Sequence, residues 1–304
     1  MRMLRWILLP VALFWLTAYE SRSLDECLAE TTVDCALDEA VLAAGKIGKQ
    51  SLRATAYSYI ARVQADIGRE ADARNMIEKV LFLKRDIMDS SAHDRIAANL
   101  ARIYALLGDV DKAMEIVEGI GDPGRVTMAY AWIAQSQAMA GDKGGADMTI
   151  SRTLAAAEDL SRDQLAFLFA QLAIARAYTG DEVETLAIAD SALELSARFN
   201  SDLLRARVAT VVAVAESAAG AQDRANISLG RVKGLLAGME SPSAPAKELA
   251  SVLAYLAWAQ ALTGDREGAL ASTELLKPLI RDRLDTSSQS SQLAAIALVL
   301  VKVE

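Results

Sequence analysis

The chain has 304 residues, of which 53% are apolar and 5% aromatic, and its formal net charge is −8. Its apolar content comes mainly from alanine, leucine, valine and isoleucine, and only five prolines are present, which is typical of an all-helical protein. The acidic balance and the lack of any cluster of five or more Lys/Arg residues exclude the electrostatic footprint of a nucleic-acid-binding protein.

The N-terminus has the pattern of an export signal. Arg2 and Arg5 form a short basic region, and residues 6–18 are apolar except for Thr17. This stretch is short of the about 20 residues that span a bilayer, so we expect a cleavable signal over residues 1–18, ending at the latest at residue 23. The protein would then be exported, and periplasmic in a Gram-negative bacterium, with no other membrane-spanning segment. An uncleaved signal that anchors the chain is the alternative, because Leu16 stands where cleavage favours a small residue.

Two cysteines, Cys27 and Cys35, follow the signal closely. An even number of cysteines in an exported protein favours a disulfide, which here would clip a capping hairpin over residues 24–47. The enclosed loop is short, so the bridge would contribute about 2–3 kcal/mol at most. Two buried free thiols are the alternative. A metal site needs further ligands, and the only histidine, His93, is remote in the sequence.

Six glycines recur at intervals of 33 to 44 residues in the central part of the chain. They are Gly68, Gly108, Gly141, Gly180, Gly220 and Gly264. An alanine stands seven residues before each glycine, and another stands five residues after each of them except where Thr185 replaces it. A period in this range predicts an array of repeated units that bury their apolar faces against their neighbours.

Each unit reads as a helix, a turn and a second helix. The alanine before each glycine is followed four residues later by another small residue, which places both on one helical face and lets a neighbouring helix approach closely. The glycine is expected to end the first helix in the left-handed conformation. Aspartate follows four of the glycines and is expected to cap the second helix. These aspartates are Asp109, Asp142, Asp181 and Asp265.

This pattern resembles the tetratricopeptide repeat family over residues 51–280. The resemblance rests on a small residue at the eighth repeat position, a glycine at the fifteenth and an alanine at the twentieth. Ile60-Ala61, Gly68 and Ala73 show it in one unit, and Leu100-Ala101, Tyr104, Gly108 and Ala113 in the next. Four of the five spacings exceed the family's about 34 residues, so the units are divergent. The resemblance implies an all-α, right-handed α-solenoid of about six to seven helix-turn-helix repeats.

Residues 287–304 are expected to form a C-terminal capping helix. The helix contains an unbroken apolar stretch from Leu293 to Val301, and its Ile296-Ala297 pair matches the start of another repeat unit. Terminal helices of repeat arrays usually carry a polar outer face, and this helix does not. We expect the stretch to be buried under a curled C-terminus. A homodimer contact or a docking surface for a partner is the alternative.

The resemblance also implies where a ligand would bind, because ligand contacts in such arrays cluster on the inner helices of a concave groove. The sixth and ninth repeat positions lie on one helical face. The candidate partner-binding residues are Tyr59, Arg62, Asn99, Arg102, Trp132, Gln135, Gln171, Tyr178, Tyr255 and Trp258. Paired arginines suit a carboxylate, and aromatic rings supply much of the binding energy at interfaces. The alternative is that the arginines pair with acids such as Asp66 and that the rings pack between units.

The sequence therefore predicts an exported scaffold or adaptor that binds a protein or peptide, without catalytic residues, cofactor or metal. One alternative is an enzyme or accessory protein acting on cell-wall glycan, with rings such as Trp132 and Trp258 stacking on sugars. Glu216-Ser217 is superficially similar to the Glu-Ser pair of lytic transglycosylases, but the residues that follow lack that family's further motif. Another alternative is a structural protein that self-associates through Leu293–Val301.

Overall fold

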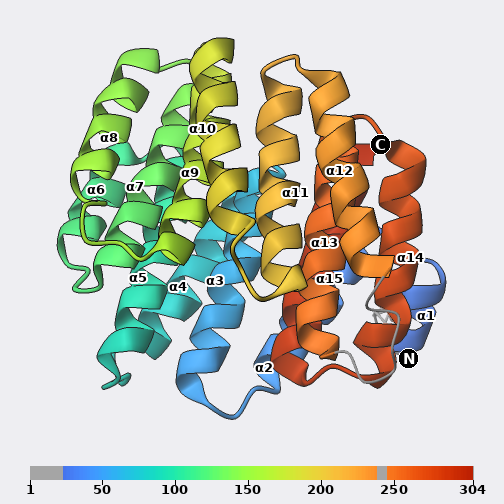
Figure 1. Cartoon of the computed structure of the whole chain (residues 1–304). Coiled ribbons are helices and arrows are strands. Elements are labelled where there is room, and N and C mark those ends of the chain that lie inside the picture. Colours follow the sequence, from blue (N-terminus) through green and yellow to red (C-terminus); the bar gives the residue numbers. More distant parts are fainter. Residues whose placement is uncertain (1–22, 238–244, 304) are drawn as a thin grey trace, which may run out of the picture.

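The computed structural model describes residues 23–237 and 245–303 (Figure 1). Within these ranges the chain forms fifteen helices and no strand, which confirms the predicted all-α fold. The predicted export signal at residues 1–18 lies outside the described residues. No described helix has the length and apolar character needed to cross a membrane.

Six consecutive hairpins make up most of the molecule. Their first helices lie side by side and form an inner layer, and each second helix packs on the outside of its own first helix. The first helices are α3 (Gln50–Asp66), α5 (Ser90–Leu106), α7 (Pro123–Met139), α9 (Arg162–Thr179), α11 (Asp202–Ala218) and α13 (Ala246–Leu262). The second helices are α4 (Glu70–Lys84), α6 (Val110–Glu118), α8 (Lys143–Ala155), α10 (Glu182–Ser196), α12 (Gln222–Ala237) and α14 (Arg266–Asp282).

The turns inside these hairpins form as the sequence predicts. All six recurring glycines have positive φ angles, between 78° and 89°, a conformation that residues with a Cβ rarely adopt. Asp109, Asp142, Asp181 and Asp265 are each the N-cap of the following helix and accept a backbone N–H with the side chain. Asp142, for example, accepts from the Gly145 N–H at 2.9 Å. Local residues therefore determine each turn.

A seventh hairpin is built from the two ends of the chain. The C-terminal helix α15 (Thr286–Val303) packs between α13 and α3. These two contacts close the inner helices into a ring. Its outer partner is α2 (Val33–Gly45) from the N-terminus, seen as the blue helix beside the red one in Figure 1. The Ser290 hydroxyl donates to the Ala40 carbonyl at 2.9 Å across this contact.

The apolar stretch of α15 is covered because α2, α3, α13 and α14 surround it. Leu293, Ile296 and Ala297 are fully buried in one core cluster with side chains of α2 and α3. A helix that is apolar on all sides is stable in water only when its neighbours cover it. The predicted burial of the stretch is therefore confirmed, and only Leu300 and Val301 remain partly exposed. The homodimer contact through Leu293–Val301 stays a prediction.

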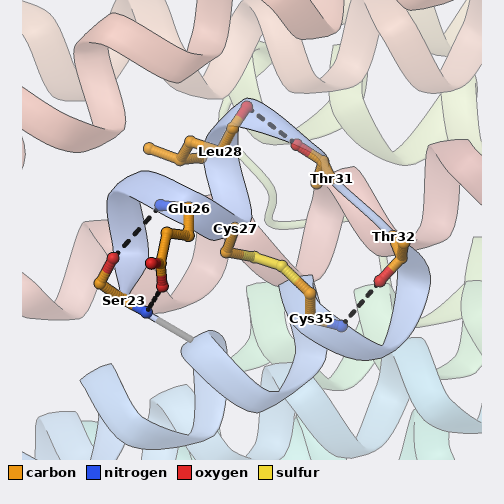
Figure 2. Close-up of a disulfide and its surroundings, with 7 residues drawn as sticks. All are labelled: Ser23, Glu26, Cys27, Leu28, Thr31, Thr32 and Cys35. Atoms are coloured by element: carbon orange, nitrogen blue, oxygen red, sulfur yellow. Dashed lines mark hydrogen bonds between the residues drawn. A yellow bond between two sulfur atoms is a disulfide. The ribbon is translucent and has the colours of Figure 1, made fainter. Parts of the chain in front are cut away.

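The short helix α1 (Leu24–Ala29) is attached to the outside of the seventh hairpin by the disulfide between Cys27 and Cys35 (Figure 2). The two Cα atoms are 5.7 Å apart. Ser23 caps α1, and the Thr32 hydroxyl caps α2 by accepting the Cys35 N–H at 3.2 Å. Helix α1 also contacts α14. The predicted disulfide is confirmed. It joins α1 to α2 next to the contact of α15 with α2 and α3, which closes the ring and which we call the seam.

Candidate functional site

The inner helices of the ring point in the same direction. Residues from the C-terminal ends of α3, α5, α7, α9, α13 and α15 line one small cavity, which we call the C-terminal mouth. They are Asp66, Leu106, Met139, Tyr178, Leu262 and Lys302. Residues from the N-terminal parts of α7, α9 and α11 line a cavity at the other end, the N-terminal mouth. Helix N-termini carry partial positive charge, and at this mouth the carboxylate of Asp122 already caps α7.

A cavity of about 220 Å³, the central cavity, lies between these two mouths. Its lining includes Tyr59, Arg62, Asn99, Arg102, Trp132, Gln171, Tyr255 and Trp258, all of which the sequence singled out. The remaining two predicted residues, Gln135 and Tyr178, line the C-terminal mouth. The structure thus brings all ten residues around one axis, from helices more than a hundred residues apart. Their role in binding a partner stays a prediction.

Arg62 is compensated within the chain. Its guanidinium forms an ion pair with Asp66 at 2.5 Å and lies over the Tyr59 ring at 4.6 Å from the centroid. Burial opposes the charge of Arg62, but Tyr59 and Asp66 outweigh it and raise its pKa. Burial also raises the pKa of Tyr59. Arg62 therefore forms the ion pair with Asp66 that the sequence analysis gave as the alternative to ligand binding.

Arg102 is compensated less, because the negative charge of Asp66 favours its charged form but does not outweigh burial. Its guanidinium lies over the Trp132 ring at 4.9 Å from the centroid, and no carboxylate among the described residues is within ion-pair distance. Desolvation, together with the nearby positive charge of Arg62, lowers the pKa of Arg102 to about 10. A desolvated cation without an anionic partner is unfavourable for the empty protein, and such groups are typical of binding sites.

The sequence analysis missed Arg207, a third arginine at the same axis. It lies over the rings of Phe167 and Tyr255, at 5.0 and 5.6 Å from their centroids. Burial alone would raise the pKa of Tyr255, but Arg207, Arg62 and Arg102 outweigh burial and lower it. Arg207 occupies the repeat position one helical turn before the sixth, as Phe167 does in the preceding unit. The helical periodicity that relates the sixth and ninth repeat positions also predicts that this earlier position faces inward.

Two buried polar atoms in the central cavity lack a partner. The indole Nε1 of Trp132 donates to no acceptor, and Oε1 of Gln292 accepts from no donor, within the described chain. Gln292 is only 9% exposed. Leaving such groups unpaired costs about 1–3 kcal/mol each. Gln292 was missed because it belongs to α15, which the sequence did not place in the ring.

The central cavity communicates with the N-terminal mouth. That mouth has a volume of about 470 Å³ and shares Trp132, Gln171 and Tyr255 with the lining of the central cavity. The C-terminal mouth is far smaller, about 70 Å³. Arg207 stands in the wall of the N-terminal mouth, at the edge of the central cavity. The N-terminal mouth, with Arg207 in its wall, is therefore the wider entrance, while Arg102 itself also lines the C-terminal mouth.

Glu216 does not face this cavity. It is 1% exposed, accepts from Arg224 Nε at 3.0 Å and from the Ser228 hydroxyl at 2.7 Å, and so joins α11 to α12. A catalytic acid needs access to substrate, and this carboxylate has none. Among the residues described, no group of three or more His, Cys, Asp or Glu side chains is arranged to hold a metal ion.

No protein-family model matches the sequence, and no curated protein is significantly similar to it. The likeness to tetratricopeptide repeats therefore rests on the residues quoted above and on the paired helices.

Proposed function

We propose that this protein is an exported, non-catalytic binding module that captures the C-terminal carboxylate of a peptide or protein chain in the central cavity. The observation that carries the proposal is Arg102, a desolvated guanidinium without an anionic partner at the centre of the ring. Arginine binds carboxylates through two parallel N–H donors, and this interaction strengthens as water is excluded. Arg207 provides a second cation on the route of entry.

Ring closure favours a chain end over an internal segment. The expected open concave groove would accommodate an extended stretch of a partner along its length. In the closed ring, an internal segment would have to thread between the mouths, and the C-terminal mouth is only about 70 Å³. A chain terminus can instead enter through the N-terminal mouth and stop at Arg102. The partial positive charge of the parallel helix N-termini favours a carboxylate there.

The aromatic residues support a carboxylate ligand rather than a glycan. Sugars stack on open faces of aromatic rings, but Arg102 covers Trp132, and Arg207 covers Tyr255. Tyr255 also meets Trp258 edge to face, with centroids 6.4 Å apart. These cation–π contacts hold the guanidiniums in place. The rings therefore position the cations.

The finer features of the fold belong to the same proposal. We treat the ring as a right-handed array of tetratricopeptide-like units in which α15 and α2 complete the seventh unit. The conserved geometry of the six glycine turns and the discontinuous last hairpin support it. Export is supported by the basic and apolar N-terminal pattern and by the disulfide, which persists in oxidising compartments. The burial of Leu293–Val299 disfavours self-association through the apolar stretch of α15.

A peptide library with randomised last residues and free C-termini tests the proposal. We expect the purified mature protein to enrich a subset of these peptides, and the amidated form of each enriched peptide to bind at least about tenfold more weakly, since one charge-assisted hydrogen-bonded contact is lost. The Arg102→Met variant should lose the preference for the free carboxylate. Isothermal titration calorimetry measures each affinity.

Arg74→Met is the matched control, because Arg74 is an exposed arginine on α4 that pairs only with Glu70 in the same helix. This variant should keep the full preference. Equal affinity for free and amidated peptides, or an unchanged preference in Arg102→Met, would show that the central cavity does not bind a carboxylate.

A further inference from the structure

A second cavity lies on the outside of the ring between α2 and α4. This outer cleft has a volume of about 930 Å³ and shares no lining residue with the central cavity. Its walls combine carboxylates with apolar side chains, among them exposed Leu42 and buried Met76. The outer cleft is therefore a separate candidate site whose charge is opposite to that of the central cavity.

Negative charge dominates the outer cleft. Asp34 is paired with Arg69 at 2.5 Å, but Asp38, Glu39 and Asp72 have no ion-pair partner among the described residues. Burial raises the pKa of Asp38, and the neighbouring charges of Asp34 and Asp72 add to the effect. Burial likewise raises the pKa of Glu39. A cation bound here would relieve the repulsion between these carboxylates.

An unpaired hydrogen-bond acceptor lines the same cleft. Gln64 is only 6% exposed, and its Oε1 atom accepts no hydrogen bond within the described chain. A buried acceptor without a donor is unfavourable by about 1–3 kcal/mol. The cleft thus contains, besides its charge, a specific position for an N–H donor.

Equivalent residues in other hairpins show why Gln64 is unpaired. In three of them the acceptor receives a hydroxyl from the outer helix, always twelve residues further along the chain. The pairs are Thr149 to Gln137 at 2.7 Å, Ser228 to Glu216 at 2.7 Å, and Ser272 to Gln260 at 2.6 Å. The residue twelve positions after Gln64 is Met76, which has no donor. This hairpin alone among the four lacks the internal donor.

We propose that the outer cleft binds an alkylammonium group, as carried by a lysine side chain or a polyamine. The ammonium donates to Gln64 Oε1 and to the carboxylates of Asp38 and Asp72, and its methylene chain lies against Leu42 and Met76. An ammonium has several N–H donors and no acceptor, which matches a cleft whose carboxylates outnumber its one cation, Arg69, and its alkyl stem suits an apolar wall. A metal ion fits less well, because no group of three or more ligands is arranged to hold one in the described chain.

Calorimetric titration with two probes at low ionic strength tests this site. The probes are spermidine and the peptide acetyl-Gly-Lys-Gly-amide, and the Nζ-acetylated form of the peptide is the control. We expect binding of at least one ammonium probe and none of the acetylated peptide. Binding of spermidine alone identifies a polyamine site, and binding of the peptide alone a site for a lysine side chain. Failure of both probes to bind overturns the proposal.

Variants locate the binding in the cleft. Asp38→Asn and Asp72→Asn alter exposed side chains and should each weaken binding several-fold, whereas Glu78→Gln, an exposed carboxylate of α4 outside the cleft lining, should not. Gln64→Leu should weaken binding about fivefold or more.

Met76→Thr should weaken the binding of the ammonium probe too, because the new hydroxyl competes for Gln64. Unchanged affinity in both aspartate variants overturns the assignment. Arg102→Met should leave it unaltered, which separates this site from the central cavity.

Discussion

Six of the hairpins in this ring differ from the seventh in how they are held together. Each of the six is continuous in sequence and is closed by a glycine turn with a positive φ angle. The seventh joins α15 to α2 without a connecting turn, through side-chain packing and the Ser290–Ala40 hydrogen bond, across almost the whole length of the chain. Local sequence is thus sufficient to form a hairpin, but the ring exists only if the ends meet.

The energetic basis of the two kinds of hairpin differs accordingly. A continuous hairpin brings its helices together at little loop-closure cost. The seventh must offset the entropy of joining distant segments, and it does so by burying Leu293, Ile296, Leu298 and Val299. Each fully buried aliphatic side chain contributes about 1.5–3 kcal/mol. We expect the seam to be the point at which the ring is most sensitive to mutation.

The largest expected effect follows from a charge placed in the seam. Ile296→Asp should destabilise the protein by about 4 kcal/mol or more, because an unpaired carboxylate would be buried where Ile296 is now fully enclosed. Urea unfolding followed by circular dichroism measures the change. Val183→Asp, at an 82% exposed position of α10, is the control and should stay within about 0.5 kcal/mol of the wild type. A small effect of Ile296→Asp would show that the seam is open in solution.

Removing the disulfide should have the next largest effect. The double variant Cys27→Ala, Cys35→Ala should lose about 2–3 kcal/mol at most, because the bridge closes a short loop and holds α1 against the seam. Thermal unfolding with and without dithiothreitol measures it. The reductant should destabilise the wild type to a similar extent and leave the double variant unchanged. Equal stability of the oxidised and reduced wild type would contradict a structural role for the bridge.

A substitution in one glycine turn tests how the continuous hairpins are closed. Gly141→Ala should destabilise by about 1–2 kcal/mol, because alanine is strained at the φ of 85° found there. Gly230→Ala in α12 is the matched control, since a Cβ at Gly230 meets no other atom and the helix favours alanine by about 1 kcal/mol. Denaturant midpoints of the two variants should therefore move in opposite directions. A shift of both midpoints to lower denaturant would contradict this explanation.

The smallest expected effect is a gain in stability. Arg102→Met should stabilise the ligand-free protein by about 1 kcal/mol, because it removes a buried and only partly compensated cation from the centre of the ring. The lowered pKa of Arg102 gives the sign of the pH dependence. Above about pH 10 the folded wild type releases this proton before the unfolded chain does, so this group's contribution to stability rises with pH there. Thermal melts at neutral and alkaline pH should show the variant's advantage shrinking, and a destabilised variant would indicate a structural arginine.

Much of the candidate site was predictable because inward-facing positions follow helical periodicity. Tyr59 with Arg62, and Tyr255 with Trp258, are each three residues apart and face the same cavity. Arg207 follows the same periodicity one helical turn earlier. It was not predicted because only the sixth and ninth repeat positions were considered. Gln292 could not be placed, because nothing in its local sequence indicates that α15 lines the same cavity as α5 and α7.

The sequence alone determined the helical hairpins, their glycine turns and aspartate caps, and the disulfide, because each depends on residues only a few positions apart. The tertiary structure decided that α15 and α2 are two halves of one hairpin, and that the expected open groove is a closed cavity. Closure depends on the small rotation between successive hairpins, summed around the whole ring. That rotation arises from side-chain packing between helices, and repeat spacings that vary from 33 to 44 residues do not encode it.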